Sequence, residues 1–179
     1  MNQFKRLIDK LETTSYLTKE EWVMLIENRN VEISEYLFEK ARKWQHKYYD
    51  NKIYTRGLIE FSNYCGIRRS NRSAERYRLN KEQMMECCEI GYKLGFRTFV
   101  LQGGEDGWFS QEILEDIIST IKKKYPDCAI TLSIGERSYK SYLGLFQAGA
   151  DRYLLRHETA EEKKYQKLHP AELSLENRK

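Results

Sequence analysis

The chain has 179 residues, of which 40% are hydrophobic and 32% are charged, a balance typical of a folded globular protein rather than a disordered one. The net charge of +4 is too small to indicate nucleic acid binding, and no apolar run approaches the roughly 20 residues that a membrane-spanning helix needs. Four cysteines without a secretory leader favour reduced thiols. We therefore expect a cytoplasmic protein that binds neither nucleic acid nor a membrane.

Amphipathic helices are predicted for the first 51 residues. Thr18 and Glu21 have the spacing of a capping box, in which each side chain satisfies a free N–H group at a helix start. In residues 1–50, nine basic residues balance nine acidic ones, and no chemistry stands out. Apolar residues recur at helical spacing as Phe4, Leu7, Ile8 and Leu11, and again as Ile33, Leu37, Ala41 and Trp44. We therefore expect residues 1–51 to form a helical extension.

The pattern changes at residue 52, where apolar strand-like runs begin to alternate with amphipathic helices. The strands are expected near 53–61, 96–101, 129–133 and 152–156, and the helices at 81–95, 110–125 and 138–149, with one more capped by Thr159 and Glu162. Such alternation is typical of a parallel sheet. A closed (β/α)8 barrel needs eight strands and about 250 residues. The sequence therefore predicts an α/β fold over residues 52–179, a partial (β/α) barrel of about four parallel strands with an open edge.

Polar residues and glycines follow each predicted strand, at the end where parallel α/β folds carry their active sites. Taken singly, each has an ordinary structural explanation, such as a tight turn for Gly103 and Gly104 or a structural role for His157. Their coincidence at one end of the sheet favours a site. They are Ser62, Asn63 and Cys65, then Gln102, Gly103, Gly104, Glu105 and Asp106, then Ser133, Gly135 and Glu136, and finally Arg156, His157 and Glu158.

The remaining cysteines and a cluster of arginines have less specific patterns. Cys87 and Cys88 lie within a helical pattern and Cys128 opens a strand, so all three are expected to pack in the core. Five arginines accompany a single acid, Glu75, in the segment after the first strand: Arg68, Arg69, Arg72, Arg76 and Arg78. They indicate either a solvated loop or a contact for an anionic substrate or a neighbouring surface.

Several motifs taken together resemble the HydE family of radical S-adenosylmethionine enzymes, maturases of [FeFe]-hydrogenase related to biotin synthase. They are "IEFSNYC", "GIRRSN", "RYRL", "FVLQGGED", "TLSIGE", "AGADRYLLRHETA" and "KLHP…ENR". The resemblance implies a (β/α)8 barrel that binds S-adenosylmethionine and a [4Fe–4S] cluster, held by a CxxxCxxC loop after the first strand. It also implies reductive cleavage of S-adenosylmethionine, a small-molecule substrate, and a role beside other hydrogenase maturation proteins.

Residues carried over from the resemblance form a predicted cofactor site. Gly103, Gly104 and Glu105 match the segment that lies beside the methionine amino group. Ser133 and Glu136 match the segment after the third strand, and Arg156 belongs to the same polar cluster. Glu158 and Arg178 match positions that lie against S-adenosylmethionine.

Two departures from the family pattern bear on activity. Here "SNYC" runs directly into "GIRR", so Cys65 is the only remaining candidate cluster ligand and matches either the first or the third cysteine of the motif. A site-differentiated [4Fe–4S] cluster needs three thiolates, so we expect this chain not to hold one. The C-terminal half of the family's barrel is also missing.

Three hypotheses remain open at this point. The first is a radical enzyme whose complete chain contains residues that the printed sequence lacks. The second is a truncated, inactive protein that at most binds S-adenosylmethionine or a partner. The third is a structural fragment that a second polypeptide completes. The identity of the substrate does not follow from these residues.

Overall fold

The computed structural model describes residues 2–64, 73–156, 158–169, 171 and 173–178, and the chain separates into two compact units, Met1–Tyr54 and Thr55–Lys179. Cys65, His157 and the arginines at 68, 69 and 72 lie outside the described residues. None of the helices in the described part of the chain is long and apolar enough to cross a membrane.

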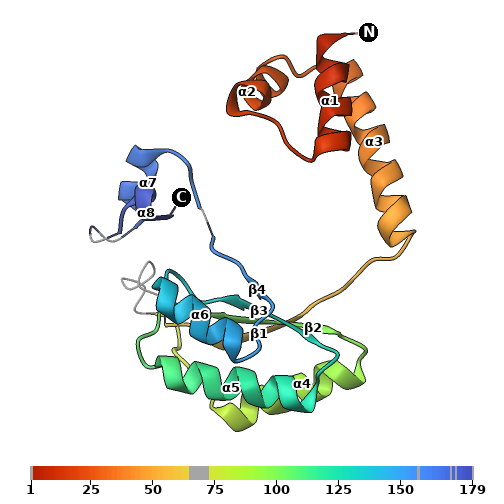
Figure 1. The fold of residues 1–179 in the computed structure, drawn as a ribbon. Helices are drawn as coiled ribbons and strands as arrows, with labels where there is room; N and C mark the ends of the chain where they lie inside the picture. Colours follow the sequence, from red (N-terminus) through yellow and green to blue (C-terminus); the bar gives the residue numbers. More distant parts are fainter. Residues whose placement is uncertain (1, 65–72, 157, 170, 172, 179) are drawn as a thin grey trace. The chain divides into compact units, whose positions relative to one another are not determined.

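The N-terminal unit consists of three helices, α1 (Gln3–Thr14), α2 (Lys19–Glu27) and α3 (Val31–Tyr49) (Figure 1). The predicted capping box starts α2, because Thr18 Oγ1 accepts from the Glu21 N–H at 3.3 Å and Glu21 Oε2 accepts from the Thr18 N–H at 2.8 Å. Polar side chains join α1 to α3: Lys40 Nζ lies 2.6 Å from Glu12 and 3.0 Å from Asp9.

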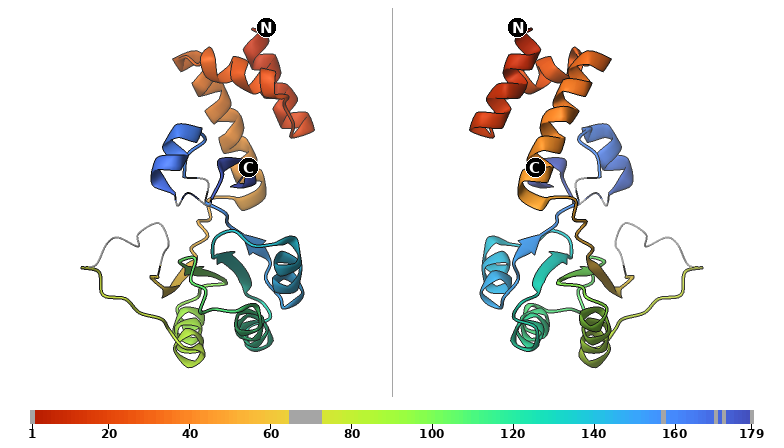
Figure 2. Two further views of the ribbon diagram at one scale, coloured as in Figure 1. Left: turned by 90° about the vertical axis from the view of Figure 1, so that its left-hand side faces the viewer. Right: turned by 90° about the vertical axis from the view of Figure 1, so that its right-hand side faces the viewer.

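The second unit is a four-stranded parallel sheet, which confirms the predicted α/β fold. Its strands β1 (Gly57–Ser62), β2 (Thr98–Gly103), β3 (Ala129–Ser133) and β4 (Arg152–Tyr153) lie in the order β1-β2-β3-β4. Helices α4 (Lys81–Lys93), α5 (Gln111–Lys124) and α6 (Tyr139–Gln147) lie along one side of the sheet (Figure 2), and α7 (Glu162–Leu168) and α8 (Leu175–Arg178) follow β4.

The alternation of side chains along each strand explains why one side of the sheet is apolar. Neighbouring residues in a strand point to opposite faces. The buried core therefore takes alternate residues from the strands, Ile59 and Phe61, Phe99 and Leu101, and Ile130 and Leu132, together with apolar residues of the three helices. The intervening residues, among them Glu60, Gln102 and Ser133, belong to the other face.

Three local expectations were wrong. Residues 53–56 are not in a strand, because β1 pairs with β2 only from Gly57 onward. The strand β4 is shorter than the predicted 152–156, because among the described residues it pairs with β3 alone. Thr159 does not cap α7: its hydroxyl accepts from the Glu161 N–H at 3.2 Å, and the helix begins at Glu162 without a side-chain cap.

Candidate functional site

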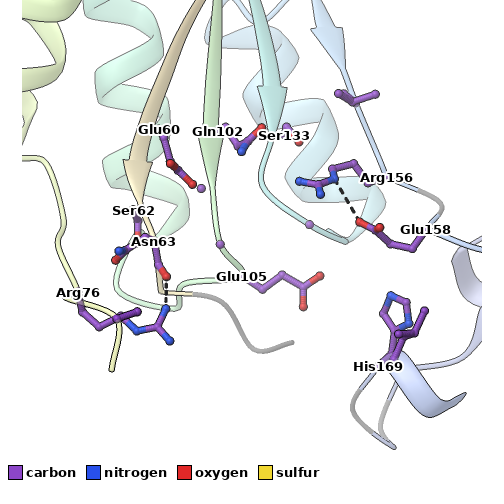
Figure 3. Close-up of a pocket in the computed structure, with 16 residues that line it drawn as sticks. Glu60, Ser62, Asn63, Arg76, Gln102, Glu105, Ser133, Arg156, Glu158 and His169 are labelled. Atoms are coloured by element: carbon purple, nitrogen blue, oxygen red, sulfur yellow. Dashed lines mark hydrogen bonds and ion pairs between the residues drawn. The ribbon is translucent and has the colours of Figure 1, made fainter. Parts of the chain in front are cut away.

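A cavity of about 380 Å³ lies at the carboxyl ends of the strands (Figure 3). This volume is within the range of small-molecule pockets, roughly 300–1,000 Å³. Six of the predicted site residues line the cavity, namely Gly103, Gly104, Glu105, Ser133, Arg156 and Glu158. Among the other residues that line it are Glu60, Ser62, Asn63, Arg76, Gln102, Gly135, Leu154 and His169.

The other predicted site residues are not placed at this cavity. Glu136 is not among its lining residues, and its Oε1 atom is buried. The Arg178 backbone belongs to α8, but its side chain is not described, and Cys65 lies outside the described residues. The predicted roles of all these residues in binding a cofactor stay predictions.

Two glycines, one at the end of β2 and one after β3, allow close contacts with neighbouring side chains. A Cβ atom on Gly103 would lie 2.7 Å from the buried ring of Phe61, so no larger residue fits there without a shift. Gly135 has a φ of 82°, and a Cβ atom on it would lie 2.3 Å from Glu105 Cγ. Glycine at 103 therefore makes room for the Phe61 ring, and glycine at 135 allows Glu105, after β2, to lie against the backbone after β3.

An ion pair between Arg78 and the buried Asp106 holds the segment after β2. Asp106 accepts from Arg78 Nε at 2.7 Å, from Ser62 Oγ at 2.6 Å and from the Trp108 N–H at 3.1 Å. Burial works to raise the pKa of the Asp106 carboxyl, but the hydrogen bonds from Arg78, Ser62 and the Trp108 N–H outweigh it and hold that pKa below its ordinary value. Asp106 is therefore an anionic anchor for the loop that carries Glu105.

Two arginines of the cluster after the first strand, Arg76 and Arg78, lie in the described part of the chain, and both contact other residues of the chain. Arg78 pairs with Asp106 and lies over the Tyr64 ring, 3.8 Å from its centroid. Arg76 donates to the Asn63 carbonyl, and Asn63 Oδ1 accepts from the Tyr77 N–H at 2.9 Å. Both arginines thus tie the end of β1 to the chain that returns after residue 72.

Side chains after β4 complete the cavity. Arg156 Nε lies 3.2 Å from Glu158 Oε1, and Glu158 has a left-handed backbone with a φ of 60° (Figure 3). His169, at the end of α7, is only 7% exposed. The family motifs include "KLHP", but nothing in its spacing indicated that His169 lines the cavity, so the residue was not predicted as part of the site.

The described residues do not fit an iron–sulfur cluster. No group of three or more His, Cys, Asp or Glu among them could hold a metal ion. Cys88 and Cys128 are buried in the core, and burial raises the pKa of the Cys88 thiol to about 12. A cluster ligand is a thiolate, so Cys88 is poorly suited to that role. Core packing of these two cysteines agrees with the prediction.

Known proteins provide an independent comparison. The chain is 38% identical to the [FeFe] hydrogenase maturase subunit HydE of Thermotoga maritima, over 97% of this chain and 51% of the relative. It is 28% identical to 3-methylornithine synthase of Methanosarcina acetivorans, over 75% of this chain and 40% of the relative. No protein-family model matches the chain.

Solved structures agree with this comparison. Methylornithine synthase (PylB) superposes with a TM-score of 0.73 at 27% identity, covering 96% of this chain and 53% of that structure. The [FeFe]-hydrogenase maturase HydG superposes with a TM-score of 0.79 at 25% identity, covering 93% of this chain and 40% of that structure.

Fold, motifs and relatives agree on a class: over nearly its whole length the chain is similar to part of a HydE-like radical S-adenosylmethionine protein. Within that class it is HydE-like, as the motifs predicted. The chain spans about half the length of the curated relatives it matches.

Proposed function

We propose that this chain binds S-adenosylmethionine in the cavity at the carboxyl ends of its strands, and that it does not hold the [4Fe–4S] cluster by itself. The observation that carries the proposal is the meeting of Gly103–Glu105, Ser133, Arg156 and Glu158 around one cavity. Gly103, Gly104 and Glu105, which end β2 and follow it, then face the amino acid end of the ligand. The likeness to HydE supports a role in [FeFe]-hydrogenase maturation.

The chain's own residues have definable tasks in this proposal. Glu105 is an exposed carboxylate held against Gly135, and it provides a negative charge for the ligand's ammonium group. The anchored Asp106 fixes the loop, so Glu105 need not be ordered on binding. Arg156 and Glu158 pair with each other and present charge of both signs to the rest of the ligand.

Restoring the cysteine loop tests the proposal. We would insert x3-C-x2-C after Cys65, which recreates the family spacing, and use the same insertion with both cysteines replaced by serine as the matched control. After anaerobic reconstitution, the unaltered chain and the serine control should retain no stoichiometric iron, whereas the cysteine insertion should retain about four iron atoms per chain. A four-iron cluster in the unaltered chain would contradict the proposal.

Ligand titration tests the proposed binding of S-adenosylmethionine. Calorimetry with S-adenosylmethionine should detect weak binding to the unaltered chain, and Glu105→Gln should weaken it, because the charge partner of the ammonium is lost. The reconstituted cysteine insertion should bind more tightly by about tenfold or more, equivalent to at least 1.4 kcal/mol. No binding to the unaltered chain at millimolar ligand would refute the site.

A further inference from the structure

The ring of His169 is held in one orientation by two contacts with Tyr165. The two rings stack with centroids 3.7 Å apart and planes 8° apart. His169 Nδ1 lies 3.0 Å from the Tyr165 carbonyl oxygen, which can only accept a hydrogen bond. Nδ1 therefore carries the proton in the neutral ring, and Nε2 is left with a free lone pair.

That lone pair has no hydrogen-bond partner among the residues that the structure describes. Nε2 of His169 is buried and makes no hydrogen bond, and the residue is 7% exposed. A buried acceptor without a partner costs free energy, and such groups in proteins are usually satisfied. The capping bond to Tyr165 uses only Nδ1, so it does not account for the placement of Nε2.

The ring also lies at the cavity. His169 lines it together with Glu158, and Figure 3 shows the ring extending from the end of α7 toward Glu158. A ligand in this cavity meets three carboxylates, those of Glu60, Glu105 and Glu158, which are better partners for a cationic group than a neutral imidazole is. The neutral Nε2 acceptor instead suits a neutral hydroxyl or amine.

We propose that His169 is a binding residue of this site, whose Nε2 accepts a hydrogen bond from a neutral hydroxyl or amine of the nucleoside part of the ligand. The inference rests on the proposed function and deepens it: Glu105 takes the amino acid end of the ligand, and His169 takes the nucleoside end. It assigns a specificity role to a residue outside the sequence-predicted set.

Two substitutions separate this role from helix capping. In His169→Asn the side-chain amide nitrogen replaces Nδ1 and can keep the bond to the Tyr165 carbonyl, but nothing replaces Nε2. In His169→Gln the amide reaches the place of Nε2 and offers an oxygen acceptor there, but the capping bond is lost. Both variants lose the stacking on Tyr165. They differ in that the first lacks the ligand contact and the second lacks the side-chain bond to the Tyr165 carbonyl.

The full chain and both variants would be titrated with S-adenosylmethionine, adenosine and methionine, and their stability measured by urea unfolding. His169→Asn should bind S-adenosylmethionine and adenosine about 3- to 10-fold more weakly, the effect of one lost hydrogen bond, with methionine binding unchanged. His169→Gln should bind all three nearly as the parent does while unfolding at lower urea. In the parent, the Nε2 nitrogen resonance should move on addition of adenosine.

Other outcomes overturn the inference in distinguishable ways. If the parent binds S-adenosylmethionine and His169→Asn binds it equally well, His169 has no ligand role although the proposed function stands. If His169→Gln alone loses binding, the residue acts as a cap only. If the parent binds neither S-adenosylmethionine nor adenosine at millimolar concentration, the proposed function fails and this inference fails with it.

Discussion

The two units of the chain are stabilised by different kinds of contact. Among the described residues of Met1–Tyr54, the buried apolar ones are Ile8, Leu17 and Ile33, and α1 and α3 are joined by ion pairs of Lys40 with Asp9 and Glu12. In the described part of Thr55–Lys179, eighteen buried residues form one cluster between the sheet and its helices.

This difference indicates which contacts make the site rigid. Burial of apolar area is insensitive to salt and to moderate changes of pH, whereas exposed ion pairs are screened and titrate. The cavity lies at the strand ends of the second unit, so its frame depends on the apolar cluster. The first unit should therefore respond to solution conditions more strongly than the apolar cluster beneath the cavity does.

The largest effect is expected from the apolar cluster. Leu132→Ala removes a side chain that is 1% exposed in the middle of β3, and should lower the free energy of unfolding of the second unit by about 2–5 kcal/mol. Urea unfolding followed by circular dichroism measures it. Phe146→Ala on α6 is the control and should change little, because Phe146 is 68% exposed. Equal losses in both variants would contradict the comparison.

An intermediate effect is expected where the site meets the core. Gly103→Ala forces a methyl group against the Phe61 ring, which itself packs on Phe109 with centroids 4.6 Å apart, and should cost about 1–3 kcal/mol of stability. Gly107→Ala is the matched control in the same loop, because nothing lies within 4 Å of its added Cβ.

A second substitution checks the cause of that loss. In a Phe61→Leu background the smaller side chain makes room, so Gly103→Ala should cost less there than in the parent. Thermal unfolding of the four chains gives the coupling between the two positions. Strictly additive losses would show that Phe61 is not the obstacle.

The smallest effect is expected in the first unit, and it should depend on salt and acid. Tyr36 and Lys40 hydrogen bonds lower the pKa of Asp9, and Lys40 does the same for Glu12. Their stabilising contribution is therefore present above the ordinary carboxyl values of 3.8 and 4.5 and is lost as the pH falls below them. Lys40→Met should slightly destabilise this unit at neutral pH and reduce that acid dependence.

In a Trp108→Phe background, tryptophan fluorescence reports the unfolding of the first unit alone, because only Trp22 and Trp44 then remain. Trp44 donates to Glu12 at 3.1 Å, so it lies beside the ion pair under test. Lys43→Met is the control, since its partner Glu39 lies on the same helix. The difference between the two variants should shrink in molar salt. A salt-independent difference would mean that Lys40 acts through packing of its aliphatic stem.

Much of the architecture could be predicted because its signals are local. Asn80 and Ser110 cap α4 and α5 through side-chain acceptors for N–H groups three residues ahead, and such pairs are visible as spacing. The alternation of strand residues between the two faces of the sheet is also local, because it follows from a repeat of two residues. Helical spacing alone would place Leu94 on the same side as the buried Met84 and Gly91, but Leu94 follows the end of α4 at Lys93 and is 72% exposed.

The sequence by itself determined the order of strands and helices, the glycine-rich loop at Gly103 and Gly104, and the single cysteine between "SNY" and "GIRR" that excludes a three-thiolate loop. Only the tertiary structure decided which distant groups meet: Arg78 with Asp106, Gly103 with the Phe61 ring, and His169 with the cavity. The physical reason is that periodicity and capping act over a few residues, whereas these contacts depend on sheet register and on how each loop returns to the strand ends.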